Sequence, residues 1–132
     1  MEEGGFLYDS DASNDELPYF VDVKGTPFLV VPYTKVYNDV KYFLAPTYAR
    51  PADFFESLRA GVEYMLAEAA RGHGGRMLSV GLHSRWSGHA HRASAVRDFV
   101  EYALERDGVS LMRRLDIAQF WLEHYGQDAS TR

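Results

Sequence analysis

The sequence predicts a single α/β domain built around a parallel sheet. Apolar runs typical of strands alternate with amphipathic helical stretches in the second half of the chain. Polar side chains directly follow several of the apolar runs, as they do at the carboxyl ends of parallel strands. With 132 residues, of which 46% are hydrophobic, the chain has room for one core. We therefore expect one domain over residues 1–132, with a frayed tail at 127–132.

The first third of the chain is predicted to be β-structure. Residues 5–8 are expected to form a short buried strand that leads into a polar loop bearing Asp9 and Asp11. Two β-rich runs, 17–23 and 26–33, flank Lys24-Gly25 and predict an antiparallel hairpin. Proline cannot donate to a sheet, so Pro32 should close the second run before the polar segment 34–39.

Three later stretches have apolar residues at helical spacing. The first, 51–72, begins with Pro51 and is expected to stop at Gly72. The second covers about 92–106 and the third about 115–125. Between the last two, residues 109–112 are a candidate strand followed by two arginines. This order predicts the β-α-β-α connections of parallel-sheet proteins, with right-handed crossovers.

The stretch 76–86 carries the main candidate for chemistry. Its apolar run, 77–82, is too short for a stable helix and follows a glycine-rich turn, so it predicts a buried parallel strand. His83 comes at the carboxyl end of that strand, where α/β proteins place ligands, and a loop is expected over 84–91. Asp9 or Asp11 is a candidate to orient the imidazole, and the alternative is a histidine hydrogen-bonded to backbone. Arg85 could bind a substrate oxygen or form a structural ion pair.

Composition excludes several classes of function. The net charge of -5, with scattered Lys and Arg, provides no basic surface for nucleic acid. No apolar run is long enough to cross a bilayer, and the first residues lack the pattern of a signal peptide, so a cytoplasmic location is expected. With no cysteine, the strong metal ligands of this chain are limited to His, Asp and Glu.

The remaining composition points to water as the nucleophile and to a partner chain. No phosphate-binding glycine loop or serine nucleophile elbow is present, so an enzyme of this sequence would activate water. His89 and His91 have a spacing that metals use, but their context favours an exposed loop.

Nine Tyr, eight Phe and two Trp exceed what a small core buries, so we expect some of them to contact another chain.

Several short strings resemble, in order, the motifs of the polysaccharide deacetylase superfamily. They are most similar to its cofactor-free allantoinase and cyclic-imide hydrolase branch. The strings are Tyr8-Asp-Ser-Asp11, Asp15-Glu-Leu-Pro-Tyr19, Val31-Pro-Tyr-Thr34 with Asn38-Asp39, Gly81-Leu-His-Ser-Arg85, and Arg113-Arg-Leu-Asp-Ile-Ala118 with Trp121. The resemblance implies half of a distorted (β/α) barrel with a β-hairpin insertion near the N-terminus.

The resemblance extends only to the C-terminal half of such enzymes. The motifs of the N-terminal half, which carry the aspartate base and the metal-binding Asp and His positions, have no counterpart here. This implies a hetero-oligomer in which a second polypeptide supplies the N-terminal half of the barrel. A truncated gene product is the alternative, and it should expose a sheet edge.

The resemblance also implies an activity and a set of site residues. The chain would be a subunit of a split hydrolase that cleaves C–N bonds of a cyclic amide, imide or ureide. His83 would be catalytic, giving a proton to the leaving nitrogen. The expected substrate-binding residues are Asp9, Asp11, Tyr33, Asn38, Arg85 and Trp86. No cofactor is expected in this chain, and a divalent metal only if the partner supplies its ligands.

Two other functions remain open from the sequence. The first is a metal-dependent N-deacetylase subunit, with the metal held by the partner. The second is a non-catalytic regulatory or scaffolding subunit that retains the fold.

Overall fold

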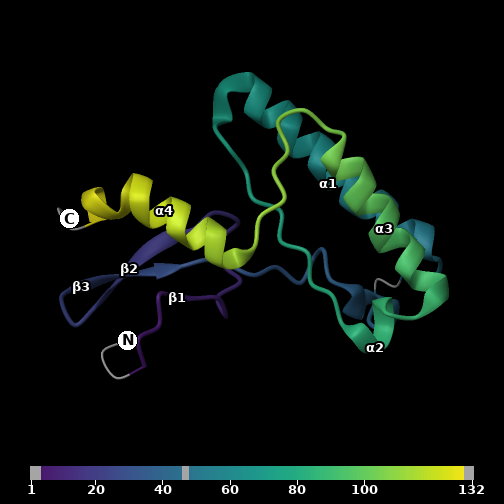
Figure 1. Ribbon diagram of the computed structural model, residues 1–132, viewed down its shortest axis with the longest axis horizontal. Helices are drawn as coiled ribbons and strands as arrows, with labels where there is room; N and C mark the ends of the chain where they lie inside the picture. The colour runs from purple at the N-terminus through teal and green to yellow at the C-terminus, as the bar shows by residue number, and fades with distance from the viewer. Residues whose placement is uncertain (1–3, 46–47, 130–132) are drawn as a thin grey trace. The chain divides into compact units, whose positions relative to one another are not determined.

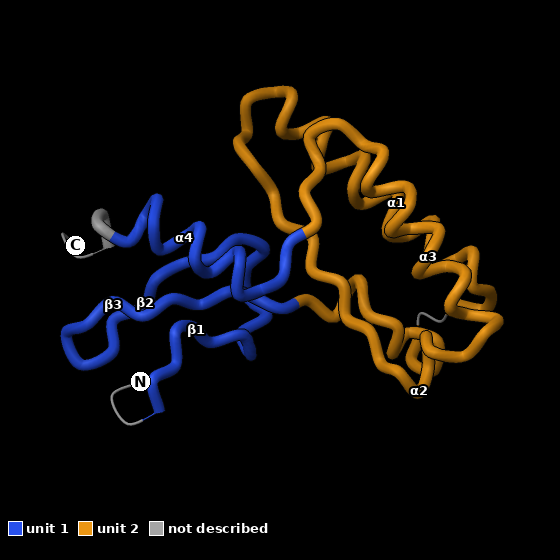
Figure 2. The backbone as a smooth tube through the Cα atoms, in the orientation of Figure 1, with its two compact units in different colours: residues 1–33, 112–132 blue, residues 34–111 orange. Residues whose placement is uncertain are grey.

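The computed structural model describes residues 4–45 and 48–129, and the chain divides into two compact units (Figure 2). Unit 1 comprises residues 1–33 and 112–132, and unit 2 comprises residues 34–111. Among the described residues, no helix combines the length and apolar character that a membrane span requires. One domain over residues 1–132 stays a prediction.

Unit 1 contains a small mixed sheet (Figure 1). Its strands are β1 (Tyr8–Asp9), β2 (Tyr19–Val23) and β3 (Thr26–Val30), in the order β1-β3-β2. β2 and β3 form the predicted antiparallel hairpin, whose turn residues Lys24 and Gly25 have φ values of 54° and 79°. A two-residue hairpin turn whose twist matches that of the strands requires both turn residues to be in the left-handed conformation.

The first strand is shorter and more exposed than the sequence predicts. Only Tyr8 and Asp9 pair with β3, in parallel register, whereas a buried strand was expected over 5–8. Phe6 and Leu7 are 69% and 43% exposed. β1 lies at the edge of the sheet beside β3, so Phe6 and Leu7 lie outside the ladder and stay exposed.

Helix α4 (Arg114–Ala129) completes unit 1 and contacts β3. Ala118, on its inner face, is fully buried. The predicted helix over 115–125 is therefore confirmed and longer at both ends. The first three residues of the predicted frayed tail are helical, and 130–132 lie outside the described residues.

Unit 2 is built on a pair of helices, α1 (Pro51–Glu68) and α3 (Ala90–Leu104), which lie along each other (Figure 1). Both match predicted helices. α1 continues into a single π-helical turn, η2 (Ala69–His73), in which Gly72 leaves the helical conformation with φ 87°. Their shared core is formed by Phe54, Leu58, Val62, Ala95, Phe99 and Ala103, together with Tyr42.

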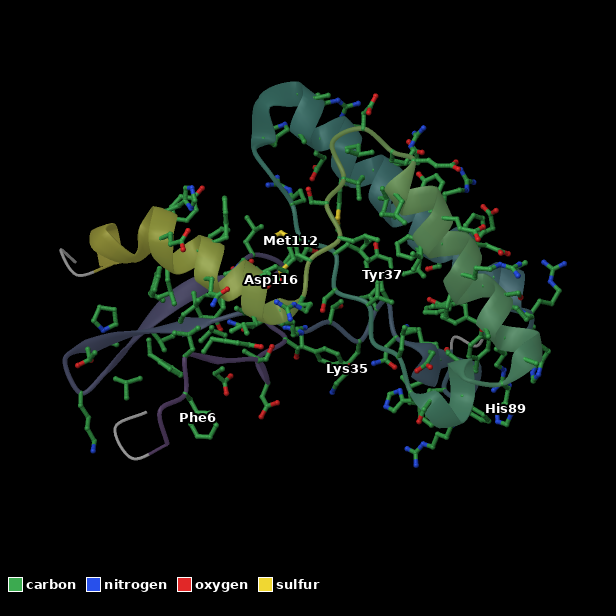
Figure 3. The ribbon with its side chains drawn as sticks, in the orientation of Figure 1. Phe6, Lys35, Tyr37, His89, Met112 and Asp116 are labelled. Carbon is green, nitrogen blue, oxygen red and sulfur yellow. The ribbon has the colours of Figure 1, made fainter. Side chains whose placement is uncertain are left out.

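Tyr37 packs directly on α1 in unit 2 (Figure 3). A Cβ atom added at Gly61 would lie 2.5 Å from the Tyr37 hydroxyl oxygen, so the glycine makes room for the tyrosine ring. This contact ties the segment before Asn38 to the helical core. The segment is also where the candidate site begins.

Two predicted strands are wrong within the described residues. Segment 76–83 is extended but forms only one parallel bridge, between Gly81 and Asn38, and 109–112 forms no strand. A buried parallel strand needs hydrogen-bonded neighbours on both sides. For Gly81 the described residues supply one neighbour, through Tyr37 O and the Asp39 N–H. The apolar run therefore predicted a strand whose neighbouring strands are missing among the described residues.

The predicted loop at 84–91 contains a short helix instead, α2 (Ser84–Ser87). His83 is its N-cap residue, and the His83 carbonyl accepts hydrogen bonds from the N–H groups of Trp86 and Ser87. His89 in turn caps α3 (Figure 3). His83 is thus attached to a helical turn rather than to a flexible loop.

Candidate active site

The site in unit 2 begins with a buried carboxylate, that of Asp39. Asp39 opens a 3-10 helix, η1 (Asp39–Tyr42), whose N-cap is Asn38. The Asn38 side-chain oxygen accepts from the Val40 N–H at 2.8 Å, and the Asp39 N–H donates to the Gly81 carbonyl at 3.0 Å. These bonds hold Asp39 beside the segment that leads to His83, with its side chain fully buried.

Three donors converge on the Asp39 carboxylate. Its Oδ1 lies 2.7 Å from Nδ1 of the His83 ring. Its Oδ2 accepts from the His83 backbone N–H at 2.8 Å and from the Ser87 hydroxyl at 2.6 Å. Removing a carboxylate from water costs free energy unless hydrogen-bond donors replace the water molecules. The three donors replace them at Asp39.

The Asp39 contact determines what the His83 ring can do. A carboxylate accepts hydrogen bonds, so Nδ1 of His83 carries the hydrogen, and Nε2 is the atom that gains or loses a proton. The His83 side chain is 39% exposed, and within the described part of the chain Nε2 has no hydrogen-bond partner. An imidazole oriented in this way is equipped for general acid or base catalysis.

Aromatic and cationic side chains lie beside the imidazole. The Trp86 ring centroid is 4.3 Å from that of His83 and 5.1 Å from that of Phe43. The Arg85 guanidinium lies 4.8 Å from the Trp86 centroid, and the Arg92 guanidinium lies 5.1 Å from that of Phe43. A planar, polar ligand can stack on such rings and hydrogen-bond to such guanidinium groups.

Three of the predicted site residues belong to unit 1. Asp9 and Asp11 are exposed, and the Asp9 carboxylate accepts from the Asp11 N–H at 3.1 Å. The Tyr33 N–H donates to the Ala12 carbonyl at 2.8 Å. The expected pairing of Asp9 or Asp11 with His83 needs correction, because the carboxylate on Nδ1 is Asp39. Substrate binding by these three residues stays a prediction.

The other predicted residues belong to unit 2. His83, Arg85 and Trp86 lie together at the start of α2. Asn38 is nearly fully buried, and its side-chain oxygen caps η1, so it places Asp39 in addition to any role toward substrate. Substrate contacts of Asn38, Arg85 and Trp86 stay predictions.

The sequence interpretation missed the roles of Asp39 and Ser87. Asp39 stood in a recognised string but was not paired with His83, because 44 residues separate them. Ser87 follows His83 by four residues, the spacing at which two side chains share one face of a helix. That signal was hidden by the expectation of a loop at 84–91.

No metal site is apparent from the residues that the structure describes. They contain no group of three or more His, Cys, Asp or Glu side chains that could hold a metal ion. The rings of His89 and His91 lie 5.9 Å apart and belong to no such group. The side chains in the described ranges therefore do not fit a resident metal by themselves.

Comparison with known proteins identifies similar folds. No protein-family model matches the chain. A Schizosaccharomyces pombe protein provisionally named as a polysaccharide deacetylase is 34% identical, over 86% of this chain and 38% of that protein. The crystal structure of Puue allantoinase is 40% identical with a TM-score of 0.86, and covers 94% of this chain and 41% of its own.

Two further crystal structures, both provisionally named polysaccharide deacetylases, are similar. The structure from Pseudomonas aeruginosa PAO1 is 38% identical with a TM-score of 0.86, over 95% of this chain and 42% of that chain. The structure from Mycobacterium smegmatis is 26% identical with a TM-score of 0.73, over 89% and 42%.

These similarities confirm the fold inferred from the motifs. The chain has a polysaccharide deacetylase-type fold, and its structural neighbours are (β/α) barrels that it matches only in part. The chain spans about two fifths of the length of the relatives that it matches. This share agrees with the half-barrel expected from the sequence, and an allantoinase is among the similar structures.

Proposed function

We propose that this polysaccharide deacetylase-type chain contributes the proton-donating side of a hydrolase that cleaves C–N bonds. The observation that carries the proposal is the pair formed by buried Asp39 and half-exposed His83, with Nδ1 and Oδ1 2.7 Å apart. A carboxylate in that position orients the ring and accepts its Nδ1 hydrogen. The named activities of the similar proteins, deacetylation and the allantoinase reaction, are consistent with such chemistry.

His83 acts on the leaving group in this proposal. Water, activated by a base outside this chain, adds to the amide carbon and forms a tetrahedral intermediate. As the C–N bond breaks, Nε2–H of His83 gives its proton to the departing nitrogen, which becomes a neutral N–H group of the ring-opened product rather than an anion. Such general acid assistance contributes about 10²–10⁴ in rate.

The substrate we propose is a cyclic amide, imide or ureide. The similarity to an allantoinase structure supports this class. Arg85 and Trp86 lie beside His83 and offer donors and a flat apolar face to a planar ring. Asp9, Asp11, Tyr33 and Asn38 are proposed to complete the contacts with substrate.

A second polypeptide is proposed to supply the rest of the barrel. The chain matches about two fifths of each similar structure, which supports a catalytic base supplied from outside it. Several large apolar side chains are also more than two fifths exposed, among them Phe6, Phe43, Leu44 and Leu104. Burial of such surface favours association. A cytoplasmic location for the complex stays a prediction.

A metal-dependent N-deacetylase is the second candidate function. Three of the similar proteins carry provisional polysaccharide deacetylase names, which favours this candidate. In that case the metal ligands come from the partner, and metal analysis of the purified complex separates the two reactions. Loss of activity on chelation, with recovery on adding Zn²⁺, would select the deacetylase.

The test of the proposal is turnover by the assembled enzyme with His83→Gln. The affinity-tagged chain is purified with the polypeptide that it retains, and formation of the carboxylate product is followed on cyclic imides, ureides and N-acetyl sugars. We expect kcat to fall by about 10²–10⁴ with assembly unchanged. His73→Gln, at an exposed histidine of the turn after α1, is the matched control and should retain full turnover.

Three results would contradict the proposal. Full turnover by the His83→Gln complex would remove His83 from the chemistry. Turnover by the chain alone would contradict the need for a second polypeptide. A loss of activity that follows only from dissociation of the His83→Gln complex would favour a scaffolding role instead.

A further inference from the structure

The Asp39 carboxylate has a third donor that the proposed reaction does not yet use. Ser87 is 94% buried, since only 6% of its surface is accessible, and its hydroxyl lies 2.6 Å from Asp39 Oδ2. The same oxygen accepts the His83 backbone N–H, while Oδ1 faces the His83 ring. Each carboxylate oxygen therefore has its own donors, and the two oxygens are not interchangeable.

One helical turn delivers these donors together. His83 is the N-cap of α2 and Ser87 is its last residue, and the Ser87 N–H donates to the His83 carbonyl at 3.0 Å. The backbone of His83 is extended, with φ -116° and ψ 126°, and the turn that follows brings the Ser87 hydroxyl to the same carboxylate as the His83 ring. Rotation of the carboxylate about its Cβ–Cγ bond would break the bonds to the Ser87 hydroxyl and to the His83 ring at once.

We propose that Ser87 is a positioning residue for His83. Its hydroxyl holds Oδ2 of Asp39, so that Oδ1 meets Nδ1–H of the imidazole in a single orientation. The hydrogen then stays on Nδ1, and Nε2 is the atom that takes up and releases a proton. The use of that proton on a leaving nitrogen rests on the proposed function, whereas the preference for the Nδ1–H form does not.

The first measurement is the tautomer of His83, by NMR of ¹⁵N-histidine-labelled full-length protein, together with any polypeptide that copurifies with it. His83→Gln identifies the His83 signals among the five histidines. We expect the neutral ring of the unmodified protein to be mainly the Nδ1–H form. In Ser87→Ala the share of the Nε2–H form should rise severalfold, and exchange of the Nδ1 hydrogen with water should quicken.

A serine on the same turn provides the matched control. Ser84→Ala removes a hydroxyl from an exposed position of α2 and should leave the His83 tautomer unchanged. In the assembled enzyme, Ser87→Ala should lower kcat about tenfold or more with little change in KM, the factor expected for one hydrogen bond to a charged group.

A second pair of variants keeps the test valid if Ser87→Ala does not fold. Ser87→Thr and Ser87→Val add the same volume, and only the threonine retains a hydroxyl. We expect Thr to keep the Nδ1–H form and Val to lose it. Equal tautomer populations in the Thr and Val variants, or an unchanged tautomer in folded Ser87→Ala, would overturn the assignment.

The two readouts separate this inference from the proposed hydrolase. If the His83 tautomer shifts in Ser87→Ala but the unmodified complex hydrolyses no amide, the positioning role of Ser87 is supported and the proposed reaction is rejected. If turnover depends on His83 but the His83 tautomer does not change in Ser87→Ala, the proposed reaction is supported and the positioning role of Ser87 is rejected.

Discussion

Both units hold a charged side chain through several hydrogen bonds, and the two clusters leave different groups exposed. In unit 1, the Arg114 guanidinium donates to the Ser10 hydroxyl and to the carbonyls of Val31 and Pro32, at 2.9 and 3.0 Å for the carbonyls. In unit 2, Asp39 accepts from the ring and backbone of His83 and from Ser87.

The difference lies in what the partners can still do. The two carbonyls and the hydroxyl that accept from Arg114 do not titrate near neutral pH, and their bonds tie α4 to the end of β3. One partner of Asp39 is an imidazole that remains 39% exposed. A buried charge contributes to chemistry when it orients a titratable group that substrate can reach, and it is structural when its bonds end on backbone.

The largest expected effect is on Asp39. Asp39→Ala leaves the Ser87 hydroxyl and the His83 backbone N–H without their acceptor, so we expect unit 2 to lose about 3–5 kcal/mol of unfolding free energy. Urea unfolding followed by Trp86 fluorescence, in a Trp121→Phe background, reports on this unit. Asp39→Asn keeps one acceptor oxygen and should lose less. Equal stability of Asp39→Ala and the parent would show that the cluster contributes nothing to folding.

Arg114 should affect stability without affecting His83. Arg114→Ala leaves two carbonyls of the β3 end without this donor, and we expect a loss of about 2–3 kcal/mol in unit 1. Trp121 fluorescence in a Trp86→Phe background measures it, and Arg114→Lys should recover part of the loss. The His83 tautomer, measured with Trp86 in place, should stay mainly Nδ1–H. A shifted tautomer would show that Arg114 also affects His83, which would contradict a purely structural role for the Arg114 cluster.

A substitution at Gly88 tests the close backbone packing at the end of α2. A Cβ atom at Gly88 would lie 2.1 Å from the Ser84 carbonyl oxygen, so Gly88→Ala must displace backbone at the end of the helix that carries His83 and Ser87. We expect a cost of about 1–3 kcal/mol to unit 2 by urea unfolding. Gly75→Ala is the control, because no heavy atom lies within 4 Å of the Cβ it would add. Equal stabilities for the two variants would contradict the close approach at Gly88.

The smallest effect is a loss of stability in acid, which both units should share. The Arg50 backbone N–H and guanidinium lower the pKa of Asp53, and the Arg113 side chain lowers the pKa of Asp116, each from the usual 3.8. A carboxyl group with a lowered folded pKa stabilises fully above the unfolded value. That contribution disappears as the pH falls below 3.8 through the folded pKa.

Asn variants measure this acid effect. Asp53→Asn in unit 2 and Asp116→Asn in unit 1 should each reduce the fall in urea midpoint between about pH 6 and about pH 3. Each variant should act mainly on the fluorescence of the tryptophan in its own unit. An unchanged pH dependence in either variant would contradict the capping role of that carboxylate.

Local chemistry was enough to predict much of the fold. The hairpin at Lys24-Gly25 and the helices α1, α3 and α4 were all predicted, because turn residues and helical spacing act over a few residues. The strands expected at 77–82 and 109–112 failed for the opposite reason. A strand depends on ladder partners that are distant in sequence, and an apolar run does not reveal whether those partners exist.

The candidate site could likewise be predicted only in part from the sequence. His83 could be predicted as the polar residue that ends an apolar run, and the order of the motifs indicated the fold. Asp39 was visible as a polar residue yet not as the partner of His83, and Ser87 was not visible at all. Its importance depends on α2, a turn formed where the pattern indicated a loop.

The sequence by itself determined the helices, the hairpin and the family of folds, and it indicated His83 as the candidate for proton transfer. The tertiary structure decided which carboxylate orients that histidine and which hydroxyl holds the carboxylate. The physical reason is that a hydrogen bond requires atoms within about 3 Å in a defined direction. For Asp39 and His83, 44 positions apart, only the folded chain supplies that proximity.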